Sequence, residues 1–186
     1  MTPSFTLLRE RLDAAVTAGD PATIAQQVKR ALQETLKGEG LALPEAFRRP
    51  RPETYARRLL HRDPDGRYTA VVMTWGPGQG TALHDHAGMW CVECVVEGEM
   101  EVRQYDLVEQ NDGHYRFEAQ ACMEALKGSA GCLIPPYEYH TLANKRGDAP
   151  SITLHIYGGE MDHCHVFEPI NDGTYRRVEK QLAYHG

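Results

Sequence analysis

The sequence lacks the long apolar runs and the excess of basic residues that would point to a membrane or a nucleic acid. No stretch approaches the roughly 18 apolar residues that span a bilayer, and the N-terminal segment MTPSFTLLRERLDAAV has neither the basic start nor the unbroken apolar stretch of a secretory signal. The formal net charge is -6, whereas phosphate binding needs clustered cations. We therefore expect a cytoplasmic protein that binds small molecules, not nucleic acid or membrane. The sequence leaves its oligomeric state open.

Cysteine is also sparse. The five cysteines, an odd number in a chain of this size, do not form a disulfide framework, and they favour a reducing compartment. Cys91 and Cys94 have C-x-x-C spacing, but they fall in a strand-like run with no second such pair, and on a strand they would face opposite sides. This pattern favours two separate thiols over a zinc or redox site.

What the sequence does contain is the pattern of two helices followed by many short strands. Residues 4–17 and 21–37 have the apolar periodicity of amphipathic helices, the second with Asp20 as its N-cap and Gly38 as its stop. After a proline-rich connector at 41–54, runs rich in β-branched and aromatic residues alternate with turn residues. We expect strands within 55–62, 67–75, 89–98, 100–109, 114–124, 131–136, 140–145, 151–159, 164–169 and 175–182.

Ten short strands predict an all-β sandwich or small barrel of jelly-roll type, with the N-terminal helices packed on it. The length of 186 residues, with 41% apolar and 25% charged residues, suits one domain with a proper core. We interpret residues 1–186 as a single domain, with the helices in 1–40 and the barrel in 55–180.

Two histidines one residue apart suggest a metal site. On a strand, His84 and His86 of ALHDHAGMW would present their imidazoles on the same face. A third ligand must come from elsewhere, and His140 of LIPPYEYHTLAN supplies one. Three neutral imidazoles leave open positions on a metal, which suits a catalytic site. On spacing alone, ordinary strand histidines are the alternative.

The residues around this pair carry a resemblance. The run Gly78-x5-His84-x-His86-x4-Cys91-x6-Gly98 resembles the first motif of the cupin superfamily, G-x5-H-x-H-x4-E-x6-G. Only the acidic ligand of the motif is missing, because Cys91 stands at its position.

The second cupin motif matches less fully. Pro135, His140 and Asn144 fit its proline, histidine and asparagine, whereas Tyr137 stands where the motif has glycine. The resemblance implies a cupin jelly-roll barrel with a metal on three histidines.

Within that superfamily, the chain resembles the type I cysteine dioxygenase family from about residue 55 to residue 167. The shared segments YARRLL, WGPGQGTALHDH, TLHIY and DHCHVF follow in the family's order, with Cys91 and His140 between them. The resemblance implies Fe(2+) held by His84, His86 and His140. It also implies a dioxygenase that adds both atoms of O2 to the sulfur of a small thiol, with L-cysteine giving cysteine sulfinic acid.

The resemblance assigns substrate binding to the segment YAR. There Arg57, with Tyr55, would hold the carboxylate of cysteine by a charged contact. A shift of one residue in register would turn Arg58 inward in its place. Relatives that prefer 3-mercaptopropionate carry glutamine at the arginine position.

Further residues receive roles from the same resemblance. Thr153, His155 and Tyr157 alternate along one strand face, and His155 would bond Thr153 on one side and the Tyr157 phenol on the other. Cys164 would line the pocket. Animal members of the family join the residues corresponding to Cys91 and Tyr157 in a thioether, whereas many bacterial members have glycine at the cysteine position. Cys91 is thus either half of this bond or a small buried side chain.

Without an acidic ligand, the metal would keep a formal 2+ charge for a thiolate substrate. The alternatives are a dioxygenase for 3-mercaptopropionate or another small thiol, a non-catalytic cupin that binds a metal or ligand, and a zinc or manganese isomerase or hydrolase. His163 and His165 repeat the spacing of two histidines without the glycine frame, so we expect no second metal there. We expect His61, His114 and His185 at the surface.

Overall fold

The structure is a computed structural model that describes residues 2–17, 19–38, 40–171 and 173–186. Two helices come first, α1 (Pro3–Ala15) and α2 (Pro21–Lys37), and both predicted helices are confirmed. Each begins at a side-chain cap, because Thr2 and Asp20 accept backbone N–H groups of the first turn. None of the described helices is long and apolar enough to cross a membrane.

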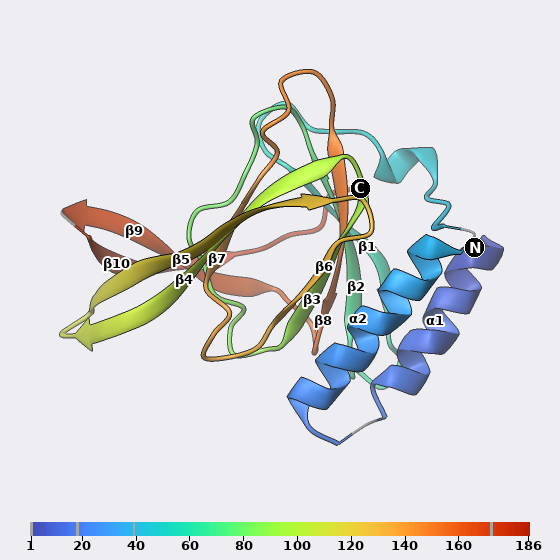
Figure 1. The fold of residues 1–186 in the computed structure, drawn as a ribbon, viewed down its shortest axis with the longest axis horizontal. Helices are drawn as coiled ribbons and strands as arrows, with labels where there is room; N and C mark the ends of the chain where they lie inside the picture. Colours follow the sequence, from blue (N-terminus) through green and yellow to red (C-terminus); the bar gives the residue numbers. More distant parts are fainter. Residues whose placement is uncertain (1, 18, 39, 172) are drawn as a thin grey trace.

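Among the described residues, ten strands follow a short 3-10 helix, η1 (Glu45–Phe47). They form two five-stranded sheets with the orders β1-β2-β8-β3-β6 and β7-β4-β5-β10-β9. The strands are β1 (Ala56–Arg62), β2 (Thr69–Trp75), β3 (Cys91–Glu97), β4 (Glu99–Asn111), β5 (His114–Leu126), β6 (Ala130–Leu133), β7 (His140–Ala143), β8 (Ser151–Tyr157), β9 (His163–Asn171) and β10 (Thr174–Gln181). The paired strands run antiparallel. The predicted all-β jelly-roll barrel with N-terminal helices is confirmed (Figure 1).

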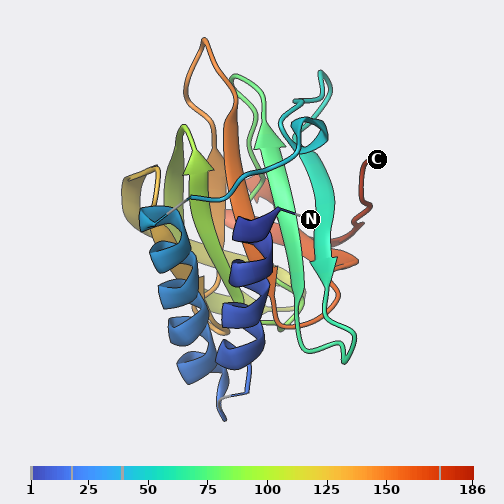
Figure 2. The same ribbon diagram turned by 90° about the vertical axis from the view of Figure 1, so that its right-hand side faces the viewer.

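The first sheet is buried on both faces. Figure 2 shows the two helices lying across its outer face, where Val72, Cys94 and Leu154 pack in one apolar cluster with helix residues. Cys91 and Tyr157 belong to a second cluster on the other face. The prediction that Cys91 and Cys94 face opposite sides is therefore confirmed. Each fully buried aliphatic side chain contributes about 1.5–3 kcal/mol, so the helices stabilise the sheet that carries the site.

The pairing of β3 with β8 determines which side chains meet inside the barrel. Cys91 lies directly opposite Tyr157, and Glu93 lies directly opposite His155. Because side chains alternate along a strand, these four share the face that points away from the helices.

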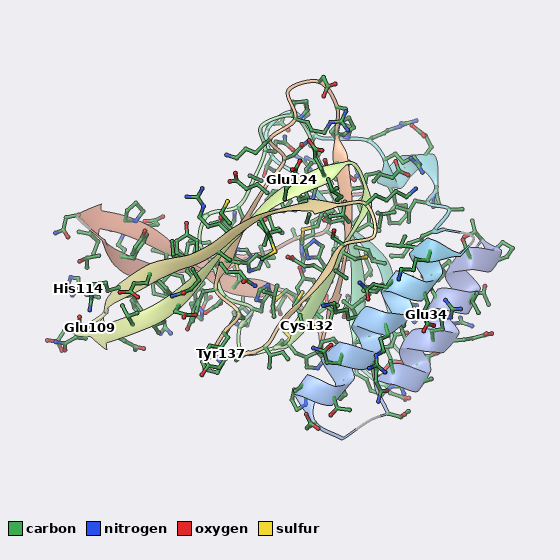
Figure 3. All side chains as sticks on the ribbon, viewed as in Figure 1. Glu34, Glu109, His114, Glu124, Cys132 and Tyr137 are labelled. Atoms are coloured by element: carbon green, nitrogen blue, oxygen red, sulfur yellow. The ribbon has the colours of Figure 1, made fainter. Side chains whose placement is uncertain are left out.

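Residues at the periphery show which parts of the chain lie far from this interior. In Figure 3, Glu109 and His114 lie at the end of the β4–β5 hairpin that points away from the helices. His114 is exposed, as predicted. Tyr137, which replaces the motif glycine, lies in the loop before β7 with 75% of its surface exposed, so its large side chain displaces nothing in the interior.

Candidate metal centre

His84, His86 and His140 converge as predicted, with one ligand atom of each within 4.8 Å of the others. His140 begins β7, whereas His84 and His86 lie in the loop between β2 and β3 and not on a strand. Only isolated bridges join His84 to β7 and β9. The chain turns immediately after the pair, where Ala87 and Gly88 have φ of 52° and 78°.

Backbone carbonyl groups determine which histidine ring nitrogens are free to bind a metal. Nδ1 of His84 lies 3.0 Å from the carbonyl oxygen of Ala82, and Nδ1 of His140 lies 2.9 Å from that of Glu138. A ring that donates its Nδ1–H to a carbonyl presents Nε2 as a free lone pair. Nε2 of His140 is buried and has no hydrogen-bond partner among the described residues. These histidines therefore fit a bound metal ion.

Burial and charge determine how these rings are protonated. Burial, together with nearby His140, lowers the pKa of His84 to about 3 and that of His86 well below its usual value, so both are neutral at pH 7. His140 differs: burial acts to lower its pKa, but the Glu93 carboxylate raises it above the usual value.

Glu93 is a carboxylate at a site where the motif predicts none. It is 7% exposed, and its Oε2 lies 3.5 Å from Nε2 of His140 and 3.5 Å from Nδ1 of His155. Burial acts to raise the pKa of Glu93, but these histidines lower it, so the carboxylate is ionised. The motif position itself holds Cys91, as predicted, but the motifs did not predict this ionised carboxylate beside the histidines. One signal was present: Glu93 is a charged residue within the apolar run CVECVV, two positions from Cys91 and so on the same strand face.

Thr153 and His155 belong to a series of polar contacts that reaches this carboxylate. Nε1–H of Trp75 donates to Oγ1 of Thr153 at 2.8 Å, and Oγ1 lies 2.8 Å from Nε2 of His155. Because an indole only donates, the hydroxyl proton of Thr153 is free for His155 Nε2, which leaves Nδ1–H directed at Glu93. The predicted contact between Thr153 and His155 is present. The second partner of His155 is Glu93, not the Tyr157 phenol, because Glu93 is its cross-strand neighbour.

A pocket beside His84 contains the predicted substrate residues. Arg57 is 2% exposed, and one of its Nη atoms donates to the carbonyl of Met161. Its Nε and Nη1 have no hydrogen-bond partner in the part of the chain that the structure describes. Arg58 faces the other side of β1, where it donates to the carbonyl of Arg49 at 2.8 Å. The pocket is lined by residues that include Tyr55, Arg57, His84, Tyr157, Cys164 and Leu182.

The second pair of histidines binds carboxylates. Nδ1 of His163 lies 2.7 Å from Oδ1 of Asp162, and Nδ1 of His165 lies 2.9 Å from Oδ2 of Asp85. Within the described ranges, neither histidine joins a group of three or more metal-ligating side chains.

Comparison with known proteins connects this geometry to a family. A family model of cysteine dioxygenase type I matches residues 23–169. The chain belongs to the cysteine dioxygenase type I family. The curated cysteine dioxygenase type 1 proteins of Rattus norvegicus and Homo sapiens are 21% and 20% identical to it over 114 residues, 61% of this chain and 56% of theirs. The chain thus spans little more than half the length of these curated relatives.

Among solved structures, TT1209 from Thermus thermophilus is 20% identical, with a TM-score of 0.49 over 64% of this chain and 96% of that chain.

Cys91 and Tyr157 are neighbours in the structure. They are cross-strand partners, and both are buried. Burial raises the pKa of the thiol and of the phenol well above their usual values, so both are protonated at pH 7. Burial likewise raises the pKa of Cys164 to about 11.

The C-terminal segment forms part of the pocket wall, which the sequence did not predict. The Tyr184 ring lies 4.8 Å from the guanidinium carbon of Arg57. The His185 backbone N–H donates to the Arg57 carbonyl at 2.7 Å, and the Arg57 backbone N–H donates to Nδ1 of His185 at 3.0 Å. His185, which we expected at the surface, is half-buried because these bonds hold it against β1. His61 is also half-buried, with its ring 5.9 Å from that of Phe5.

Proposed function

We propose that this protein is an iron(II)-dependent thiol dioxygenase that oxidises L-cysteine with O2 to cysteine sulfinic acid. Membership of the cysteine dioxygenase type I family supports the reaction class. The group of three histidines supports the metal. The five free thiols support a reducing, cytoplasmic location.

The burial of Arg57 and the lack of hydrogen-bond partners for two of its nitrogens among the described residues are the observation that supports a substrate with a carboxylate. Its guanidinium is buried beside His84 and Tyr157, and two of its nitrogens have no hydrogen-bond partner among the described residues. A buried cation with unused donors is costly unless an anion pairs with it. A carboxylate matches the planar fork of arginine and can accept two hydrogen bonds from it. A thiol that carries a carboxylate could bind the metal through its sulfur and Arg57 through its carboxylate.

The other residues bind and orient the substrate. Iron held by the protein would coordinate the substrate sulfur as a thiolate and bring it together with O2. Both oxygen atoms are added to sulfur, so the reaction needs no further reductant. Arg57 holds the carboxylate, while Tyr55 and Cys164 shape the pocket. Tyr157 keeps its proton at pH 7 and offers a phenol hydrogen bond inside the pocket.

We propose that Cys91 and Tyr157 form the thioether of the animal enzymes. Directly opposed residues of an antiparallel pair have Cβ atoms about 4.5–5.5 Å apart, within reach of a bond from sulfur to the phenol ring. The bond removes one hydrogen from the thiol and one from the ring, and O2 accepts both with their electrons.

The test is oxygen uptake by protein loaded with Fe(II) under anaerobic conditions. We expect uptake with L-cysteine to exceed uptake with 3-mercaptopropionate and with cysteamine, which has no carboxylate. Faster uptake with 3-mercaptopropionate would assign that thiol as the substrate. No uptake with any of the three would contradict the proposal and favour a cupin that only binds a ligand or metal. Protein loaded with Zn(II) is the matched control.

A further inference from the structure

We propose that Glu93 is a fourth protein ligand of the metal held by His84, His86 and His140. The inference deepens the function proposed above and rests on it for the identity of the metal as iron. Glu93 is not the acidic residue of the cupin motif, whose position is that of Cys91, two residues earlier on β3.

The first support is a distance. Oε2 of Glu93 lies 3.5 Å from Nε2 of His140, the nitrogen left free by the contact of Nδ1 with a backbone carbonyl. Metal bonds of about 2.0–2.2 Å place neighbouring ligand atoms about 3–3.5 Å apart. Glu93 lies outside the group formed by the three histidines, so coordination by Glu93 would require its carboxylate to move toward the ion.

The second support is that two buried polar atoms lack hydrogen-bond partners in the described part of the chain. Oε2 of Glu93 and Nε2 of His140 are both buried, and neither has a hydrogen-bond partner within residues 2–17, 19–38, 40–171 and 173–186. Removing a carboxylate from water costs several kcal/mol, which a close counter-ion offsets. A metal ion between the two atoms satisfies both of them at once.

The third support is the set of side chains behind Glu93. Trp75 donates to Thr153, Thr153 bonds Nε2 of His155, and Nδ1 of His155 lies 3.5 Å from the Glu93 carboxylate. Carboxylates that bind metals are themselves oriented by hydrogen-bond donors of this kind. Thr153 and His155 therefore act as positioning residues for Glu93.

Coordination by Glu93 would change the charge of the site and the number of open positions on the ion. Three neutral histidines and one carboxylate give a formal charge of 1+ with a divalent ion. A fourth protein ligand would leave fewer open positions on the ion, which the substrate sulfur and O2 would share.

The experiment compares Glu93→Gln with Glu138→Gln, a second buried carboxylate variant near His140. Fe(II) affinity is measured anaerobically by competition with a chromophoric chelator, and the visible bands of bound Co(II) report its coordination. Neither measurement uses a thiol or O2, so the result stands even if the protein oxidises no thiol.

We expect Glu93→Gln to weaken Fe(II) binding more than about 100-fold, beyond the 10- to 100-fold cost of losing a partner that only orients a ligand. The Co(II) bands should change in this variant, and Glu138→Gln should leave both readouts unchanged. Unchanged Co(II) bands in Glu93→Gln, or a loss of affinity in Glu138→Gln alone, would overturn the proposal. If Glu93→Gln does not fold, Thr153→Val provides the test, because it loosens the carboxylate without replacing it and should weaken Fe(II) binding about tenfold.

Discussion

Replacement of Arg57 tests how the pocket selects its substrate. Arg57 is buried beside His84, and the fork of its guanidinium has two nitrogens without a hydrogen-bond partner among the described residues. Hydrogen bonds to a charged group contribute about 1.5–3 kcal/mol, which corresponds to about 10- to 150-fold in kcat/KM. Arg57→Gln should therefore lower kcat/KM for L-cysteine by that factor and leave kcat/KM for cysteamine nearly unchanged.

The neighbouring arginine provides the matched control. Arg58 is also buried, but it faces the opposite side of β1 and contacts Thr74 and the carbonyl of Arg49. Arg58→Gln should change stability without changing the ratio of the two kcat/KM values. Arg57→Lys keeps the charge but loses the fork, so it should fall between the wild type and Arg57→Gln.

The assay is initial-rate oxygen uptake at equal iron content, with each variant checked for folding by thermal unfolding. An equal fold loss for L-cysteine and cysteamine in Arg57→Gln would refute the carboxylate contact, because cysteamine has no carboxylate to lose.

Three further predictions concern covalent chemistry, stability and the metal. If Cys91 and Tyr157 are joined, the intact mass is lower by about two hydrogens than the sequence mass, and Cys91→Ser abolishes the difference; an unshifted mass after turnover shows that no bond forms. Side-chain hydrogen bonds from Arg67 lower the pKa of Asp63 to about 2, so this contribution to stability is complete above the unfolded pKa and is lost as pH falls toward 2. Asp63→Asn should cost about 1–2 kcal/mol in urea unfolding at pH 7 and less at pH 3, and an equal cost at both pH values would contradict this. Chelation of the metal should lower the melting temperature and Fe(II) should restore it, since a ligand of the native state stabilises that state; an unchanged melting temperature would speak against a metal at the three histidines.

The fold was largely predictable because its patterns are local. The helix caps, the helical periodicity and the alternation of apolar residues in the strands all act within a few residues, and both helices and the ten strands were predicted. The glycine frame likewise identified His84 and His86, although they lie in a loop, and the second motif identified His140. Their meeting depends on the turn at Ala87 and Gly88, which strand periodicity does not describe.

The parts that were missed depend on pairings between distant segments. Glu93 reaches the metal site because β3 pairs with β8 in the register that sets it opposite His155. A one-residue shift would turn it toward the helices. Tyr184 reaches Arg57 because the last residues of the chain run back along β1. No periodicity in these segments encodes either contact.

The most direct test of the account is the fate of labelled O2 in a single reaction. Protein loaded with Fe(II) is mixed with L-cysteine under 18O2, and the product is analysed by mass spectrometry. The account predicts cysteine sulfinic acid in which both sulfinate oxygens carry the label, with one O2 consumed for each thiol. Consumption of O2 with cystine as the product, or no consumption by fully loaded protein, would contradict it.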